Sequence, residues 1–374
     1  MIFKNSNIVQ LLPELNEGGV ERGVVELNRE FVKRGIKSHV ISKGGKLVKQ
    51  IQSDGGHHHC LNICDKNPFS LPLRVTQLRR ILRNIKPDII HSRSRYPAWI
   101  SWFANKKLNI PYVTTVHGMN SINHYSRIMT TGDKVICVSE VIQKYVSDAY
   151  PIKHDKLVVV QRGVDMDYFN PVLTNAEFKK AFSRQFNLPG RFVVTGVGRV
   201  SWLKDYESFI KAVSICREKI PNITGLIVGG AREDKIEYLN SLKKLARKEG
   251  IENCLHFTGS QDKMPEIYQL SNIVVNASLK MGNVGRTVVE ALAMNTPVLA
   301  TSYPGLNNLI RDNFNGYIIK KQNVQDLCKK IQYLHEKPLK NTRMSIPRDF
   351  TLKAMVDDTI KVYSSLLDNL RRYN

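Results

Sequence analysis

Short apolar runs alternate with amphipathic helical stretches along the whole 374-residue chain. This alternation is typical of parallel sheets covered by helices on both faces, so it predicts an α/β fold. In the first half we expect strands at 8–12, 39–41, 88–91, 112–116, 134–138 and 157–160, and helices at 24–34, 75–85 and 97–105. In the second half we expect strands at 192–196, 226–229, 255–257, 273–275 and 297–300, and helices at 206–217, 236–248, 264–270 and 287–294.

The two similar halves predict two domains, since one hydrophobic core stops growing at roughly 250–300 residues. A polar connection opens at Asn170-Pro171 and runs to Leu188-Pro189-Gly190, where we expect the inter-domain linker. The expected domains are 1–170 and 171–351, followed by one amphipathic helix over 352–372. Open parallel sheets bind ligands at the carboxyl ends of their strands, so two facing sheets would form a cleft lined by loops.

The cellular location is predicted from the absence of a membrane-spanning run, a signal peptide and paired cysteines. No apolar run approaches the roughly 20 residues needed to cross a bilayer, and the N-terminus has no basic segment followed by a long apolar stretch. The six Cys are scattered and show no paired spacing. We therefore expect a cytoplasmic protein with reduced thiols.

The formal net charge of +23 predicts an acidic partner. Residues 74–107 carry nine cations against Asp88, interleaved with Trp99, Trp102 and Phe103; the cations are Arg74, Arg79, Arg80, Arg83, Lys86, Arg93, Arg95, Lys106 and Lys107. Such a mixture is typical of a surface that meets anionic lipid, and the alternative is a solvated basic face. No nucleic-acid partner is expected, because the chain has neither an aromatic RNA-reading motif nor a zinc finger.

Three loops after predicted strands carry candidate site residues. Gly18-Gly19 opens a helix, whose backbone N–H groups can approach an anion. Arg199 and Lys204 follow another strand and could converge on a diphosphate. His117 ends a strand at a Val-His-Gly turn. The alternatives are a structural turn, two surface cations and a structural histidine.

The segment Gly285-Arg286-Thr287 begins a further helix, with Glu290 in its first turn. This helix start can hold a phosphate while Glu290 accepts hydrogen bonds from a ribose diol, or the glutamate only complements the helix dipole. The cluster His57-His58-His59-Cys60 lacks the usual zinc-ligand spacing. Fingerprints of dinucleotide oxidoreductases, P-loop kinases and serine hydrolases are missing.

In this order, the motifs resemble those of the retaining nucleotide-sugar glycosyltransferases of family 4, which have the GT-B fold of two Rossmann-like domains. The resemblance covers nearly the whole chain and rests on Gly18-Gly19-Val20-Glu21, Lys86-Pro87-Asp88-Ile89-Ile90-His91, Thr115-Val116-His117-Gly118, Val138-Ser139-Glu140, Arg162-Gly163-Val164-Asp165, Gly198-Arg199 with Lys204, Val228-Gly229-Gly230, and Gly285-Arg286-Thr287 through Glu290-Ala291.

The resemblance implies specific roles. Arg199 and Lys204 would bind the donor diphosphate, Glu290 the donor ribose, and His117 would lie beside the sugar. Donor-binding positions would further include Gly18, Gly19, Asn283, Gly285, Arg286 and Thr287. It also implies a nucleoside diphosphate sugar as donor substrate, no metal or other cofactor, and a final helix (352–374) that packs back on the N-terminal domain. The expected acceptor is a cell-envelope polysaccharide, such as capsule or lipopolysaccharide, or a lipid-linked glycan, met at the inner face of the cytoplasmic membrane.

The chain departs from the family pattern at two positions. The first glutamate of the E-x7-E motif is replaced by Gly282, next to Asn283, whose amide could take over its contacts with the sugar. Asp205 stands where the family usually has Gly. Two hypotheses follow: a sugar-transferring enzyme, or a non-catalytic relative that binds nucleotide or envelope components.

Overall fold

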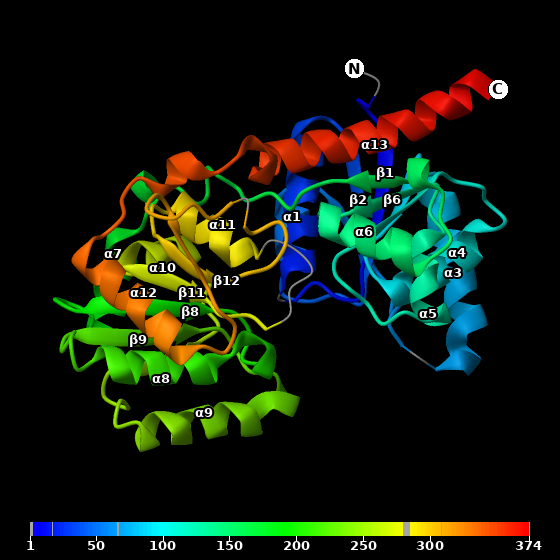
Figure 1. The fold of residues 1–374 in the computed structure, drawn as a ribbon. Helices are drawn as coiled ribbons and strands as arrows, with labels where there is room; N and C mark the ends of the chain where they lie inside the picture. Colours follow the sequence, from blue (N-terminus) through cyan, green and yellow to red (C-terminus); the bar gives the residue numbers. More distant parts are fainter. Residues whose placement is uncertain (1–2, 17, 66, 280–284, 308, 374) are drawn as a thin grey trace. The chain divides into compact units, whose positions relative to one another are not determined.

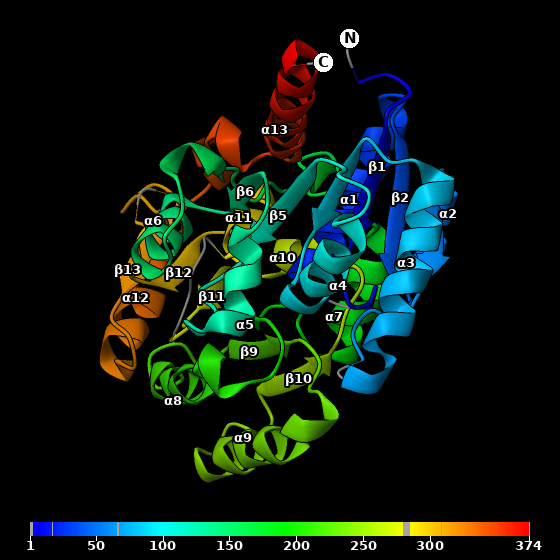
Figure 2. The ribbon, with the colours of Figure 1, turned by 90° about the vertical axis from the view of Figure 1, so that its right-hand side faces the viewer.

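The computed structural model describes residues 3–16, 18–65, 67–279, 285–307 and 309–373. Figures 1 and 2 show the ribbon in two views. The chain divides into two compact units, residues 1–163 with 352–374 and residues 164–351. Each unit holds a parallel sheet between helices, which is the predicted α/β architecture with two Rossmann-like sheets.

The described residues of the first unit form a seven-stranded parallel sheet in the order β3-β2-β1-β4-β5-β6-β7. Its strands are β1 (Asn7–Leu11), β2 (Lys37–Ser42), β3 (His57–Cys60), β4 (Ile89–Ser92), β5 (Tyr112–Val116), β6 (Lys134–Cys137) and β7 (Leu157–Val159). Its helices are α1 (Gly19–Lys33), α2 (Val48–Ser53), α3 (Leu71–Ile85), α4 (Arg95–Asn105), α5 (His124–Arg127), α6 (Glu140–Ala149) and α13 (Leu352–Tyr373).

Successive strand residues of this sheet point to opposite faces and enter different cores. Ile8 and Ile89 pack with Phe31 of α1 and with α13, whereas Val9 and Ile90 pack with α3 and α4 on the other face. Both faces of the sheet are therefore buried, which explains why successive strand residues such as Ile8-Val9 and Ile89-Ile90 are apolar.

The described residues of the second unit form a six-stranded parallel sheet in the order β10-β9-β8-β11-β12-β13. Its strands are β8 (Phe192–Val197), β9 (Ile223–Val228), β10 (Leu255–Gly259), β11 (Ile273–Asn276), β12 (Val298–Thr301) and β13 (Gly316–Ile319). Its helices are α7 (Ala176–Gln185), α8 (Tyr206–Cys216), α9 (Ile236–Lys248), α10 (Met264–Leu270), α11 (Arg286–Ala293) and α12 (Val324–Glu336). One core lies against α8, α9 and α12, and the other against α7, α10 and α11.

Two expectations about organisation need correction. The division between the units falls between Gly163 and Val164 rather than at residue 170. Much of the expected linker is helix α7, whose Phe182 is buried in the core of the second unit. The polar composition that suggested a linker belongs to the exposed face of this helix.

The histidine cluster is also a regular element. His57, His58 and His59 form strand β3 at the edge of the first sheet, and His39 of β2 stacks on His57 with ring centroids 4.9 Å apart. Among the described residues, no group of three or more His, Cys, Asp or Glu side chains is arranged to hold a metal ion.

Candidate functional site

The Gly18-Gly19 turn places the start of α1 just after the carboxyl end of β1. Gly18 has φ +147, a backbone conformation that L side chains rarely adopt, so this position favours glycine. The carbonyl oxygen of Gly19 accepts a hydrogen bond from Nη2 of Arg162. The predicted helix start is therefore present, and Arg162 of the Arg-Gly-Val-Asp motif contacts it.

His117 follows β5 and lines a cavity of about 210 Å³ in the first unit. The cavity is bordered by Pro13, Val20, Glu21, Arg93, Ser94, Arg95, Thr115, His117, Gly118, Asn120 and Met129. Burial lowers the pKa of His117 well below its ordinary value of 6.5, and the positive charges of Arg93 and Arg162 lower it further. The imidazole is therefore neutral at physiological pH and offers one donor and one acceptor nitrogen.

Arg93 is a residue of this cavity that the sequence did not single out. It follows β4 directly and is only 6% exposed, and burial lowers its pKa to about 10, so it stays cationic. Its position could have identified it as a candidate site residue, because it follows the carboxyl end of a buried parallel strand.

The basic stretch 74–107 does not form one surface. Arg74 is buried and donates to the carbonyl oxygens of Asp65, Asn67 and Ser70. Arg79 donates to the carbonyl oxygen of Ala104 at the end of α4. With Arg93, these side chains point inward, whereas Arg80, Arg83, Lys86, Lys106 and Lys107 are exposed. The expected patch is therefore smaller than the sequence suggested.

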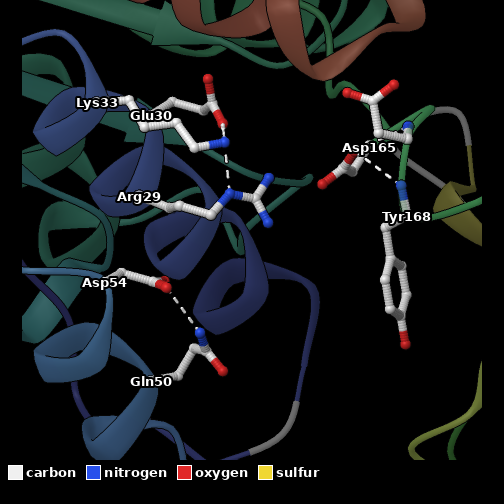
Figure 3. A network of polar contacts seen from close by, with 8 residues as sticks. Arg29, Glu30, Lys33, Gln50, Asp54, Asp165 and Tyr168 are labelled. Atoms are coloured by element: carbon white, nitrogen blue, oxygen red, sulfur yellow. Dashed lines mark hydrogen bonds and ion pairs between the residues drawn. The ribbon is translucent and has the colours of Figure 1, made fainter.

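Asp165 of the Arg-Gly-Val-Asp motif forms a turn in the second unit. Its Oδ1 accepts hydrogen bonds from the backbone N–H groups of Asp167 at 3.0 Å and Tyr168 at 3.1 Å, and Figure 3 shows the Tyr168 bond. This aspartate therefore fixes the chain just after the boundary between the units.

Lys204 is held at the carboxyl edge of the second sheet. Its Nζ donates to Oγ of Ser278 at 3.1 Å. Burial lowers the pKa of Lys204, and the neighbouring charge of Arg199 lowers it further. The two predicted cations therefore interact, with Arg199 exposed and Lys204 fixed.

A chain of hydrogen bonds links Lys204 to the start of α11. Ser278 Oγ lies 2.6 Å from Oδ1 of Asn276, and the Asn276 amide donates to Oγ1 of Thr287 at 3.2 Å. Gly285 N–H donates to the Tyr303 hydroxyl at 3.1 Å. The structure thus brings the predicted residues Lys204, Thr287 and Gly285 into one edge of the sheet.

Glu290 is 8% exposed and tightly held. Its Oε1 lies 2.7 Å from Nε of Arg286, and its Oε2 accepts a hydrogen bond from the Tyr268 hydroxyl at 2.8 Å. Because a carboxylate has about four acceptor positions, both oxygens can still accept from a ligand. Arg286 therefore orients Glu290, a contact that their i,i+4 spacing could have predicted.

The backbone conformation of Asp205 explains why the family usually has glycine at this position. This residue has φ 48 and ψ 48, the left-handed region, and its side chain caps α8 by accepting from Ser208 N–H. Gly282 and Asn283, by contrast, lie outside the described residues.

The structure places the remaining candidates in separate units: Gly18, Gly19 and His117 in the first, and Arg199, Lys204 and Glu290 in the second. All six cysteines are free thiols. Within the described part of the chain, no helix is both long and apolar enough to cross a bilayer.

Two parallel-sheet units of this kind define the GT-B class, and solved structures agree. A glycosyltransferase from Rickettsia africae superposes with a TM-score of 0.88 at 29% identity, covering 98% of this chain and 99% of that chain. Anabaena Alr3699/HepE, solved with UDP and glucose, superposes with a TM-score of 0.84 at 18% identity, covering 96% and 100%.

Sequence comparison identifies the family. Residues 17–168 match Glycosyltransferase Family 4, and residues 178–346 match Glycosyl transferases group 1. The chain belongs to the glycosyltransferase family that combines these two domains. A curated relative, the D-inositol 3-phosphate glycosyltransferase of Salinispora tropica, is 26% identical over 257 residues, which cover 62% of this chain and 53% of the relative. The match thus spans about half the length of that relative.

Proposed function

We propose that this protein is a hexosyltransferase that moves a sugar, with retention, from a nucleoside diphosphate sugar to an acceptor. The acceptor is a cell-envelope polysaccharide or a lipid-linked glycan. The family membership supports the class of reaction, and the second unit supports the class of donor.

The observation that carries the proposal is the fixed position of Lys204 beside Arg199. The ammonium group is held by Ser278 and is joined through Asn276 to the start of α11. Two cations and a helix N-terminus at the carboxyl edge of one sheet suit a diphosphate, which needs several donors and a positive field.

In the proposed reaction, an acceptor hydroxyl attacks the anomeric carbon as the bond from that carbon to the diphosphate oxygen breaks. The proton of the hydroxyl passes to the leaving diphosphate, so the products are a glycoside and a nucleoside diphosphate. Negative charge grows on the diphosphate in the transition state. Arg199 and Lys204 stabilise that charge more than the ground state, which lowers the barrier without a further cofactor or metal.

Other residues bind the donor in this proposal. Glu290, oriented by Arg286, accepts hydrogen bonds from the ribose hydroxyls. The neutral imidazole of His117 exchanges hydrogen bonds with a sugar hydroxyl. Gly18 and Gly19 border both the donor phosphate and the acceptor, and Asn283 supplies the contact that the missing glutamate at Gly282 would make.

The replacement at Gly282 keeps a second function open, that of a non-catalytic protein binding nucleotide or envelope components. Only the enzyme would release nucleoside diphosphate from a nucleotide sugar. Release of UDP, GDP or ADP from a panel of nucleotide sugars, with and without acceptor, separates them. Nucleotide binding without release in both the parent and Gly282→Glu would favour the binding protein.

We also propose that the protein is cytoplasmic and meets the inner face of the membrane peripherally through the exposed side of α3. Phe69 and Leu73 are 92% and 60% exposed, and Arg80, Arg83 and Lys86 are exposed along the same segment. Apolar side chains can enter the head-group region while cations meet lipid phosphates. This location suits a lipid-linked acceptor.

A further inference from the structure

Arg93 differs from the other buried arginine of its stretch. Arg74 is 5% exposed and donates to three backbone carbonyl groups, so its charge is satisfied within the fold. Arg93 is 6% exposed, yet no described residue accepts a hydrogen bond from its side chain, and its Nε is buried without a partner. A buried guanidinium left unsatisfied is costly, so it indicates a ligand.

The surroundings of Arg93 are positive. Arg95 lines the same cavity, and neither arginine forms an ion pair with any carboxylate of the described residues. Glu21 is the one acidic residue among the residues that border the cavity, while burial keeps His117 neutral. The first turn of α1, through Val20 and Glu21, places the positive end of a helix there.

The cavity also has the size for an anionic group. A single water needs about 10–15 Å³ of such space, and the cavity offers about 210 Å³. Ser94 and Thr115 add hydroxyl groups to its wall. Arg95 donates to Oγ of Ser126 at 3.1 Å, which leaves its charge without an ion pair to any described residue. Guanidinium groups bind phosphate oxygens with paired N–H donors, whereas a neutral sugar does not need two cations that lack an ion pair.

We infer that the acceptor carries a phosphate group, which binds in this cavity against Arg93 and Arg95. The inference rests on the proposed function and deepens it by naming the acceptor class. The phosphate belongs either to a phosphorylated sugar or to a lipid phosphate that links the glycan to the membrane. It is distinct from the donor diphosphate, for which Arg199 and Lys204 of the second unit are proposed.

Binding of inorganic phosphate tests the site directly. We expect Arg93→Gln to weaken phosphate binding at least tenfold by calorimetry and to keep the UDP affinity of the parent. Arg247→Gln, which removes an exposed cation from α9 in the second unit, serves as the matched control and leaves both affinities unchanged. Equal phosphate affinity in Arg93→Gln and the parent would overturn the inference, and so would phosphate binding that Lys204→Ala abolishes and Arg93→Gln retains.

Thermal unfolding of each variant checks that it folds. If Arg93→Gln does not fold, Arg95→Gln takes its place, because Arg95 is half-buried and lines the same cavity. A phosphate affinity in Arg95→Gln equal to that of the parent then contradicts the inference.

Transfer assays separate the two sources of phosphate and the two proposals. Transfer to a soluble sugar phosphate, or to a polyprenyl-phosphate glycan in vesicles, identifies the source, and Arg93→Gln should lower kcat/KM at least tenfold for that acceptor. Transfer to an uncharged acceptor with equal kcat/KM in parent and variant refutes the phosphate site and keeps the proposed function. Arg93-dependent phosphate binding without any transfer refutes the proposed function and keeps the site.

Discussion

His91 and Tyr363 lie 272 positions apart in the chain, and Nδ1 of the histidine is 2.6 Å from the hydroxyl of the tyrosine. The other ring nitrogen of His91 is 2.6 Å from Oγ1 of Thr115. Both residues are fully buried in the first unit. This contact joins α13, the last helix of the chain, to the sheet formed by the first 163 residues.

Tyr363→Phe should lower the free energy of unfolding by about 1–3 kcal/mol, because the substitution leaves a buried ring nitrogen of His91 without its partner. Urea denaturation measures the change. Tyr333→Phe, which removes the hydroxyl that donates to Asn313 at 3.2 Å near the surface, should change stability by less than about 0.5 kcal/mol. Equal effects of the two substitutions would show that the His91 contact does not stabilise the fold.

Stability should decrease as the pH falls below 6.5. Burial lowers the pKa of His91 and His117 well below that value, so the unfolded chain takes up protons that the folded chain does not. The stabilisation is complete above pH 6.5 and is lost on acidification, by up to about 1.4 kcal/mol per pH unit for each histidine.

Denaturation at pH 7.5 and 5.5 measures this dependence. His117→Asn should reduce the slope, whereas His154→Asn, at an exposed histidine, should not. A slope that is the same in all three proteins would contradict the assignment of His117 as a neutral buried group.

Glu290→Gln should weaken nucleotide binding by about 1.5–3 kcal/mol, since it removes the charge that strengthens hydrogen bonds to the ribose hydroxyls. Glu207→Gln is the matched control, because Glu207 also accepts a hydrogen bond from a tyrosine, Tyr238, at 2.8 Å. Calorimetry with UDP, GDP and ADP gives the affinities. If Glu290→Gln binds nucleotide like the parent but unfolds more easily, Glu290 has only a structural role as the partner of Arg286 and Tyr268.

Exchanging Arg80, Arg83 and Lys86 for Gln should reduce binding to anionic vesicles by about 3 kcal/mol, since each cation near such a surface contributes about 1 kcal/mol. The control exchanges three exposed lysines of α9, Lys243, Lys244 and Lys248. Flotation at low and high salt measures the binding. Equal loss in both triple variants would show that net charge, rather than the α3 surface, attracts the protein.

Much of the fold could be predicted because its central strands are apolar and its helices amphipathic. Strand β5 and helices α9 and α10 begin and end at the predicted residues. Strand β3 could not be predicted, since His57, His58 and His59 form an edge strand with little buried surface. The charged residues of helix α7 favoured a linker over a helix, although Phe178, Phe182 and Phe186 recur at helical spacing and pack together.

For the candidate site, the sequence could predict which residues follow the strands, but not which side chains they contact. Lys204, Thr287 and Glu290 follow from such positions, but the contact of Lys204 with Ser278 depends on strand order in the sheet. The sequence also treats Arg74 and Arg93 alike, as members of one basic stretch. Both side chains are buried, and hydrogen bonding distinguishes them, because Arg74 donates to backbone carbonyl groups whereas no described residue accepts from the side chain of Arg93. This difference depends on tertiary packing.

The most direct test of the proposed function is donor turnover by Lys204→Ala beside the parent. Losing a buried charge that faces the diphosphate should cost about 2–5 kcal/mol in donor use. Lys211→Ala, at an exposed lysine of α8, is the control. We predict that the parent and Lys211→Ala release nucleoside diphosphate from one nucleotide sugar at equal rates, while kcat/KM falls at least thirtyfold in Lys204→Ala. Equal release by all three proteins, or none from any nucleotide sugar, would contradict the proposal.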